Sequence, residues 1–124
     1  MEINEISEGD IAVLALSGQM DSNTSKQLED VLPQRVQRAP GVVLDLSGVQ
    51  YVSSAGLRVM LRGAKLARGA GHTLVLAGLT PPVSEVIQVS GFSAIFRIYA
   101  NRSDALAALA SQIVPSATDD RRAD

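Results

Sequence analysis

The chain has 124 residues, a formal net charge of -2 and no cysteine, and 46% of its residues are hydrophobic. This length fits one domain, and because only 3% of the residues are aromatic, the core must be aliphatic. Scattered Lys and Arg argue against a nucleic-acid partner, and a single His without Cys excludes a Cys/His zinc site and any disulfide. We therefore expect no metal and no cofactor.

The N-terminal segment and the longest apolar runs bear on location. Residues 1–6 are acidic and alternating, which differs from the basic-then-apolar form of a signal peptide. No apolar run approaches the roughly 20 residues that a membrane-spanning helix needs. We expect a cytoplasmic protein with no membrane insertion.

The first third of the chain predicts a hairpin and a helix. Residues 3–7 alternate weakly and residues 11–16 are almost all apolar, so the glycine-containing turn between them favours an antiparallel hairpin. Residues 21–25 are rich in helix-capping side chains and precede a helix that has Leu28 and Val36 on one face. Pro33 lies inside that pattern and predicts a kink or a break.

The next segments alternate between strands and helices. Residues 42–46 predict a strand covered on both faces, and a loop from Ser47 leads to a helix that begins near Ser54. Its apolar positions at helical spacing are Leu57, Met60, Leu61, Ala64 and Ala67. Further elements follow as a strand at 73–77, a helix opened by Pro81 and Pro82, a strand at 95–99 and a helix capped by Asn101.

The resulting order, β-β-α-β-α-β-α-β-α, predicts an α/β fold. We expect a mixed, mostly parallel sheet of about five strands packed with about four helices. Residues 1–114 form one domain in this interpretation. Residues 115–124 contain almost nothing apolar and predict a disordered tail.

Polar side chains follow the carboxyl ends of the predicted parallel strands, where sites in such sheets gather. We expect them to approach one another as a rim of hydroxyls and carboxylates. The rim consists of Asp21, Ser22, Thr24, Asp45, Ser47, Ser53, Ser54 and Thr80.

This rim is poorly equipped for catalysis. A serine hydrolase needs a base, and His72 precedes a strand at the opposite end of the sheet, where we interpret it as a surface turn residue. A phosphate-binding loop would need more glycine and a lysine. A phospho-aspartate site at Asp45 would need partner acids that the sequence does not supply, so we favour a carboxylate that bonds to loop N–H groups. We expect no enzyme.

Ser54 has two interpretations that the residues alone leave open. Serine is a good helix cap, and Ser53 and Ser54 at a helix start need no further reason. The second interpretation is that Ser54 is phosphorylated. A phosphoserine carries about -1.5 to -2 charge. The dipole and free N–H groups of a helix N-terminus tolerate that charge, so the surface would change sign while the fold stays intact.

Two segments carry a resemblance to a known family. They are residues 16–21 (Leu-Ser-Gly-Gln-Met-Asp) and residues 42–57, which contain Asp-Leu-Ser-Gly-Val-Gln-Tyr-Val-Ser-Ser-Ala-Gly. With the register of the later elements, they resemble a STAS domain, specifically a bacterial anti-sigma-factor antagonist, up to about Val114. The resemblance implies a STAS fold and a substrate and binding module rather than an enzyme.

The resemblance also implies a partner-switching cycle that regulates transcription, for example in a stress response. The unphosphorylated antagonist binds an anti-sigma factor with a histidine-kinase-like ATPase fold, which releases the sigma factor. That kinase then phosphorylates the antagonist on the helix-start serine and the complex dissociates. A PP2C-type phosphatase resets the antagonist.

The family's phosphoacceptor matches Ser54. Ser53 stands where many members carry Asp, and it is the less favoured acceptor. The implied contact surface comprises Asp21, Ser22, Thr24, Ser53, Ala55, Gly56, Leu57, Arg58 and Arg62. Arg58 and Arg62 also fit a plain solvated face. The alternative function is a non-switching STAS adaptor, for instance of a lipid ABC transporter.

Overall fold

The structure is a computed structural model that describes residues 1–122, with side chains described for residues 1–112. The tail predicted for residues 115–124 lies outside the residues that are described in full, so it stays a prediction.

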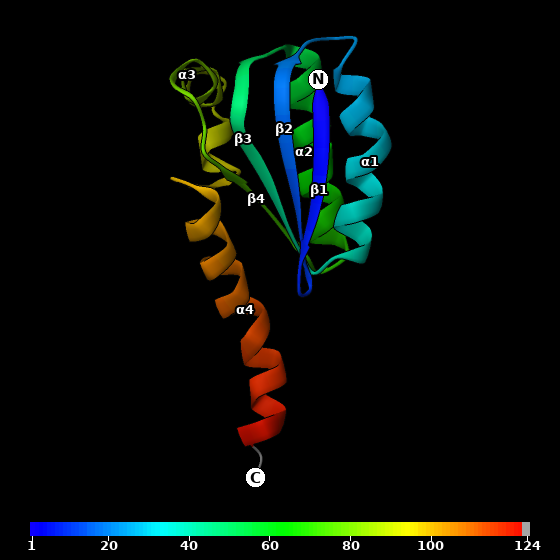
Figure 1. The fold of residues 1–124 in the computed structure, drawn as a ribbon, viewed down its shortest axis with the longest axis vertical. Helices are drawn as coiled ribbons and strands as arrows, with labels where there is room; N and C mark the ends of the chain where they lie inside the picture. Colours follow the sequence, from blue (N-terminus) through cyan, green and yellow to red (C-terminus); the bar gives the residue numbers. More distant parts are fainter. Residues whose placement is uncertain (123–124) are drawn as a thin grey trace.

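The described residues form a five-stranded sheet in the order β1-β2-β3-β4-β5 (Figure 1). Its first strand is antiparallel to the second, and the remaining pairs are parallel. The strands are β1 (Glu2–Glu8), β2 (Ile11–Met20), β3 (Gly41–Val52), β4 (Thr73–Ala77) and β5 (Arg97–Tyr99). This confirms the predicted α/β fold with a mixed, mostly parallel sheet.

Helices cover both faces of the sheet (Figure 1). They are α1 (Ser25–Arg38), α2 (Ser54–Gly69), α3 (Pro81–Val89) and α4 (Arg102–Arg122), with a short 3-10 turn η1 (Phe92–Ala94). Alternation along β2 separates the two layers: Leu14 packs with α1, α2 and α3, whereas Val13 packs with Ala105 and Leu109 of α4.

Two details of the helices differ from the sequence prediction. Helix α1 runs unbroken through Pro33, so the predicted break is wrong. The carbonyl that loses its hydrogen bond to the missing N–H belongs to Glu29, an exposed residue. In α2, the predicted apolar positions Leu57, Leu61 and Ala64 are only half-buried, and Gly56, Val59 and Gly63 join Met60 and Ala67 in the buried face.

Strand β3 is longer than predicted. The sequence predicted a strand at 42–46 followed by a loop, but β3 extends to Val52. Ala15 of β2 pairs with Asp45 of β3, and the next pair is Ser17 with Gly48. β3 therefore contains one extra residue between these two pairs, which shifts the register. A Cβ on Gly48 would lie 2.8 Å from the carbonyl oxygen of Leu16, so glycine permits this bulge.

Candidate functional site

The ends of β2 and β3 lie together and place the starts of α1 and α2 side by side. The N–H of Ser53 donates to the carbonyl oxygen of Met20 at 2.8 Å. Gly56 is buried against this junction, because a Cβ added there would lie 2.6 Å from Sδ of Met20. Glycine therefore lets the first turn of α2 approach β2. The exposed residues of this turn are Ser54 and Arg58, and a partner could contact them.

The two serines at the start of α2 have different environments. Ser53 is the N-cap: its backbone is extended (φ -84°, ψ 171°), and its Oγ accepts the N–H of Gly56 at 3.2 Å. Ser54 is the first residue of the helix and is exposed. The backbone N–H groups of Ser54 and Ala55 have no hydrogen-bond acceptor among residues 1–112. The capping hydroxyl is thus Ser53, and the hydroxyl of Ser54 faces solvent.

The loop before α1 is locked by its own side chains. The carboxylate of Asp21 accepts the N–H groups of Asn23 and Thr24 at 2.9 and 2.8 Å, and the hydroxyl of Thr24 donates to the carbonyl of Gln19 at 2.6 Å. The bond from the Thr24 N–H lowers the pKa of Asp21. Asp21 and Thr24 therefore shape this loop, and Ser22 is its exposed hydroxyl.

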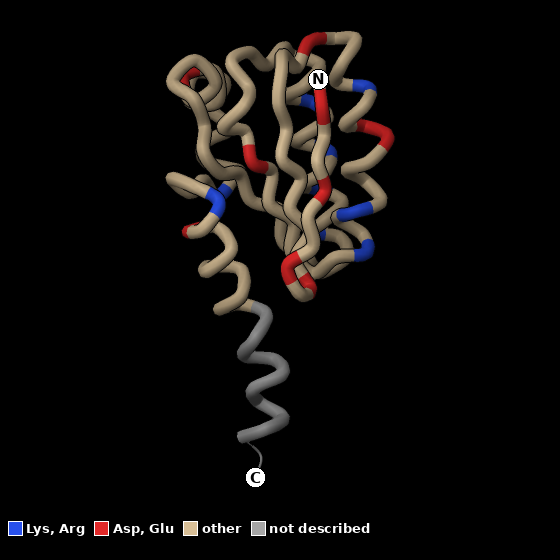
Figure 2. The backbone as a smooth tube through the Cα atoms, in the orientation of Figure 1, with Lys and Arg blue, Asp and Glu red and all other residues tan. Residues whose placement is uncertain are grey.

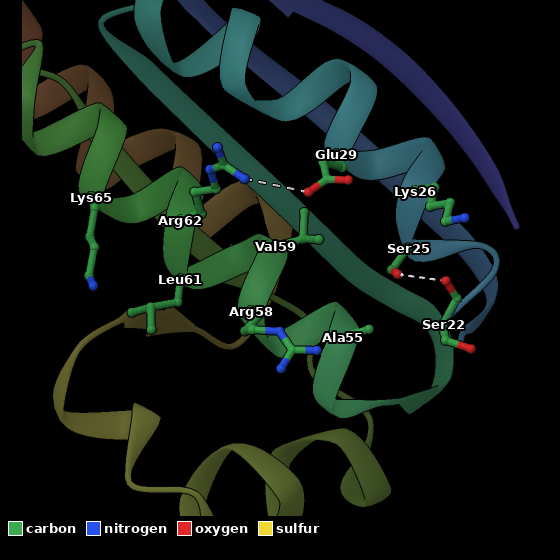
Figure 3. Close-up of a pocket in the computed structure, with 10 residues that line it drawn as sticks. All are labelled: Ser22, Ser25, Lys26, Glu29, Ala55, Arg58, Val59, Leu61, Arg62 and Lys65. Atoms are coloured by element: carbon green, nitrogen blue, oxygen red, sulfur yellow. Dashed lines mark hydrogen bonds and ion pairs between the residues drawn. The ribbon is translucent and has the colours of Figure 1, made fainter.

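A groove of about 430 Å³ lies across α2 and its border with α1 (Figure 3). Its apolar lining comes from Ala55, Val59 and Leu61. The remaining lining residues are Ser22, Ser25, Lys26, Glu29, Arg58, Arg62 and Lys65. Arg62 pairs with Glu29 at 3.6 Å, and both side chains are substantially exposed, at 70% and 47%. The groove therefore combines a small apolar area with four cations.

A second polar cluster lies on β3 and at the start of α4. Asp45 is buried, and its carboxylate accepts the N–H of Ser47 at 3.0 Å and a 2.8 Å ion pair from Nη2 of Arg102. Burial raises the pKa of Asp45, but the hydrogen bonds from Ser47 and Arg102 outweigh it, so that the pKa is lowered overall. The predicted bond from Asp45 to a nearby N–H is confirmed, and its arginine partner was missed.

The predicted convergence of eight polar residues is therefore only partly correct. Asp21, Ser22, Thr24, Ser53 and Ser54 meet where β2 and β3 end. Asp45 lies seven residues before the end of β3, roughly 20 Å along an extended strand, and Ser47 stays with it. Thr80 donates to the carbonyl of Val49 at 2.7 Å and holds the start of α3 instead. The length of β3 is what separates the two clusters.

His72 lies apart from both clusters. It is half-buried after α2, and its Nδ1 lies 2.7 Å from the carbonyl oxygen of Val36 near the end of α1.

None of the helices of the described residues meets both the length and the hydrophobicity that a membrane span requires.

Comparison with known proteins gives a family. The family profile described as "Mlab, STAS domain" matches residues 4–98. BtrV of Bordetella bronchiseptica, which is assigned as an anti-sigma factor antagonist, is 43% identical over 77% of this chain and 84% of its own length. The chain belongs to the STAS-domain family of anti-sigma factor antagonists.

Other members of this STAS family agree in sequence and in fold. The anti-sigma F factor antagonist of Paenibacillus polymyxa is 32% identical over 80% of this chain and 86% of its own length. The crystal structure of an anti-sigma factor antagonist from Mycobacterium paratuberculosis superposes with a TM-score of 0.80 at 25% identity, over 87% of this chain and 92% of that one. Anti-sigma factor antagonists are regulators rather than enzymes.

Sequence reasoning about this STAS domain missed three charged residues of the groove, Lys26, Glu29 and Lys65, and its lining residues Ser25, Val59 and Leu61. The signal for them was spacing, because residues at i, i+3, i+4 and i+7 share one face of a helix, as Lys26 and Glu29 do on α1 and Arg58, Arg62 and Lys65 do on α2. That the two faces adjoin follows from the packing of α1 on α2, which no local pattern reveals.

Proposed function

We propose that this chain is an anti-sigma-factor antagonist that is switched by phosphorylation of Ser54. In its unphosphorylated form it binds an anti-sigma factor with a histidine-kinase-like ATPase fold, which frees a sigma factor. That kinase phosphorylates Ser54 and the complex dissociates, and a PP2C-type phosphatase resets it. The cycle operates in the cytoplasm.

The observation that supports the proposal is that the two serines at the start of α2 have different structural roles. Ser53 uses its hydroxyl to cap α2, whereas Ser54 presents its hydroxyl to solvent at the first helical position. The names of the relatives supply the partner class, since both are antagonists of anti-sigma factors.

The surroundings of Ser54 suit an added phosphate. The first-turn N–H groups of Ser54 and Ala55 have no acceptor within residues 1–112, and the positive end of the helix dipole favours an anion there. Phosphorylation would add about -1.5 to -2 charge to an exposed position without breaking the Ser53 cap. The modification therefore changes the surface and leaves the fold in place.

The test measures binding to the cognate kinase. Every histidine-kinase-like anti-sigma protein of the source genome is screened pairwise against this chain, and the strongest binder is purified for titration calorimetry. We expect Ser54→Asp to weaken binding by at least about tenfold, equivalent to about 1.4 kcal/mol. Ser54→Ala should bind like the wild type, because it removes the acceptor and adds no charge.

Ser53→Asp is the matched control for this titration. It places the same charge one residue earlier, where aspartate is also a good N-cap, and where many relatives are expected to carry that residue. It should bind the kinase nearly as well as the wild type. A Ser54→Asp protein that binds as tightly as the wild type would contradict the proposed switch.

A second candidate is a non-switching adaptor, for instance of a lipid ABC transporter. The observation in its favour is the matched family profile, whose description names Mlab. In this case the same surface would dock constantly and Ser54 would carry no phosphate. Mass spectrometry of the peptide that spans residues 53–58, from protein purified from its own cells, separates the candidates: phosphate on Ser54 supports the switch, and its absence in every growth condition supports the adaptor.

A further inference from the structure

The charge of this protein is distributed unevenly over its surface. The chain as a whole is acidic, with a net charge of -2, yet the groove across α1 and α2 contains four of its 11 cations and one carboxylate, that of Glu29. Figure 2 shows the opposite sign along β1 and its turn, where acidic residues gather. The positive groove is therefore a local feature that the overall composition hides.

Three of the four groove cations have no carboxylate partner within residues 1–112. Arg62 is paired with Glu29, whereas Lys26, Arg58 and Lys65 are exposed and make no ion pair with any described side chain. Figure 3 shows them spread over the rim: Lys26 on α1, Arg58 at the front of α2 and Lys65 further along the same helix. Because these exposed cations have no carboxylate partner among the described residues, an acidic occupant of the groove would be attracted to them.

The groove also offers apolar contact beneath this rim. Ala55 and Leu61 are half-buried and Val59 is 8% exposed, so limited apolar surface accompanies the cations, with Val59 toward α1 and Leu61 on the opposite side of α2 (Figure 3). This combination suits an amphipathic segment that places small apolar side chains on the floor and Asp or Glu on the rim. It does not suit a nucleic acid, because no aromatic side chain lines the groove for stacking.

We propose that the groove formed by Ala55, Val59, Leu61, Lys26, Arg58 and Lys65 binds an acidic segment of the anti-sigma kinase. The inference rests on the proposed function and adds the chemistry of the partner's docking element. It also gives the switch a physical cause. Ser54 lies one helical turn before Arg58, so a phosphate on Ser54 stands at the edge of the groove and repels the acidic segment.

The first experiment neutralises the rim. Lys26→Gln, Arg58→Gln and Lys65→Gln, singly and combined, are titrated with the purified cognate kinase at low and high salt. Each should weaken binding about threefold and the triple variant about thirtyfold at low salt, with smaller losses at high salt where charges are screened. Arg68→Gln is the matched control, since Arg68 is exposed on the same helix outside the groove, and it should bind like the wild type.

The second experiment identifies the contact. A carbodiimide joins a lysine amine to a carboxylate only where the two touch, and mass spectrometry then maps the joined peptides. We expect Lys26 and Lys65 to be joined to Asp or Glu of the kinase, and Ser54→Asp to reduce these products. Joined peptides from two copies of this chain, through the acidic residues of β1, would instead make the occupant a second copy and overturn the proposal.

The outcomes keep this inference separate from the proposed function. If the triple variant binds the kinase as tightly as the wild type while Ser54→Asp still weakens binding, the acidic docking segment is wrong and the switch stands. If Ser54→Asp has no effect on binding, the switch falls and this inference falls with it.

Discussion

Ser54 at the start of α2 and Asp45 on β3 are polar residues in opposite circumstances. Asp45 is buried and its bonds to Ser47 and Arg102 satisfy it within the domain. Ser54 is exposed, and its N–H finds no acceptor among the described residues. The comparison teaches that polar groups which satisfy one another hold this fold together, whereas those left open are available to a partner.

The two regions should therefore respond oppositely to mutation. Changes in the Asp45 cluster should alter the free energy of unfolding and leave partner binding unchanged in the folded protein. A negative charge introduced at Ser54 should weaken binding and change the free energy of unfolding much less than Asp45→Asn does. Three stability measurements examine this contrast.

The largest effect on stability is expected from Asp45→Asn. This change keeps an oxygen that can accept the N–H of Ser47 and removes the charge that pairs with Arg102. Breaking a buried pair costs about 3–5 kcal/mol, but the Arg102 side chain is 38% exposed and water screens the pair. We expect a loss of about 1–2 kcal/mol in urea denaturation at pH 7.

This loss should depend on pH in a defined direction. Because the folded-state pKa of Asp45 is lowered, its contribution is fully present above the ordinary carboxyl pKa of about 3.9 and disappears as the pH falls through the folded-state value. Wild type and Asp45→Asn should therefore converge in stability at acidic pH. A difference that stays constant from pH 7 to pH 3 would show that charge is not its cause.

An intermediate effect is expected from Ser53→Ala. It removes the hydroxyl that accepts the N–H of Gly56, and losing a helix N-cap costs about 1 kcal/mol. Thermal and urea unfolding measure it, with Ser54→Ala as the matched control that should change stability much less. If Ser54→Ala were the more destabilising of the two, the assignment of the cap to Ser53 would be wrong.

The smallest effect is expected from Ser54→Asp. A negative charge in the first turn of α2 interacts favourably with the helix dipole, so stability should rise by about 0.3–1 kcal/mol at low salt. Urea unfolding of wild type and Ser54→Asp at low and high salt measures this difference in stability, and the stabilisation should be smaller at high salt. A clear loss of stability would mean that any weakened binding of this variant reflects damage to the fold.

Much of the fold could be predicted because the apolar spacing is regular. The period of α2, the run of residues 73–77 and the Asn101 cap each indicated their element, and Asn101 indeed accepts the N–H of Asp104 at 2.8 Å. Strand β3 was cut short because Ser47 and Gly48 are typical of a turn. Gly48 is instead required by the close approach of β2, a tertiary contact that the local sequence does not reveal.

The candidate site was harder to predict for the same reason. The sequence indicated Ser53 and Ser54 together but could not divide their roles, which depend on the extended backbone of Ser53. It also could not pair Asp45 with Arg102, since 57 residues separate them. The groove cations were visible as helix faces, but their meeting depends on how α1 packs against α2.

The central claim is that the anti-sigma kinase phosphorylates Ser54 and not Ser53. The most direct measurement incubates the purified cognate kinase and ATP with wild type, Ser53→Ala and Ser54→Ala, and maps the phosphate by mass spectrometry. The account predicts stoichiometric phosphate on Ser54 in wild type and Ser53→Ala, and none in Ser54→Ala. Phosphate on Ser53, or an unmodified wild-type protein in the presence of a kinase that binds it, would contradict the account.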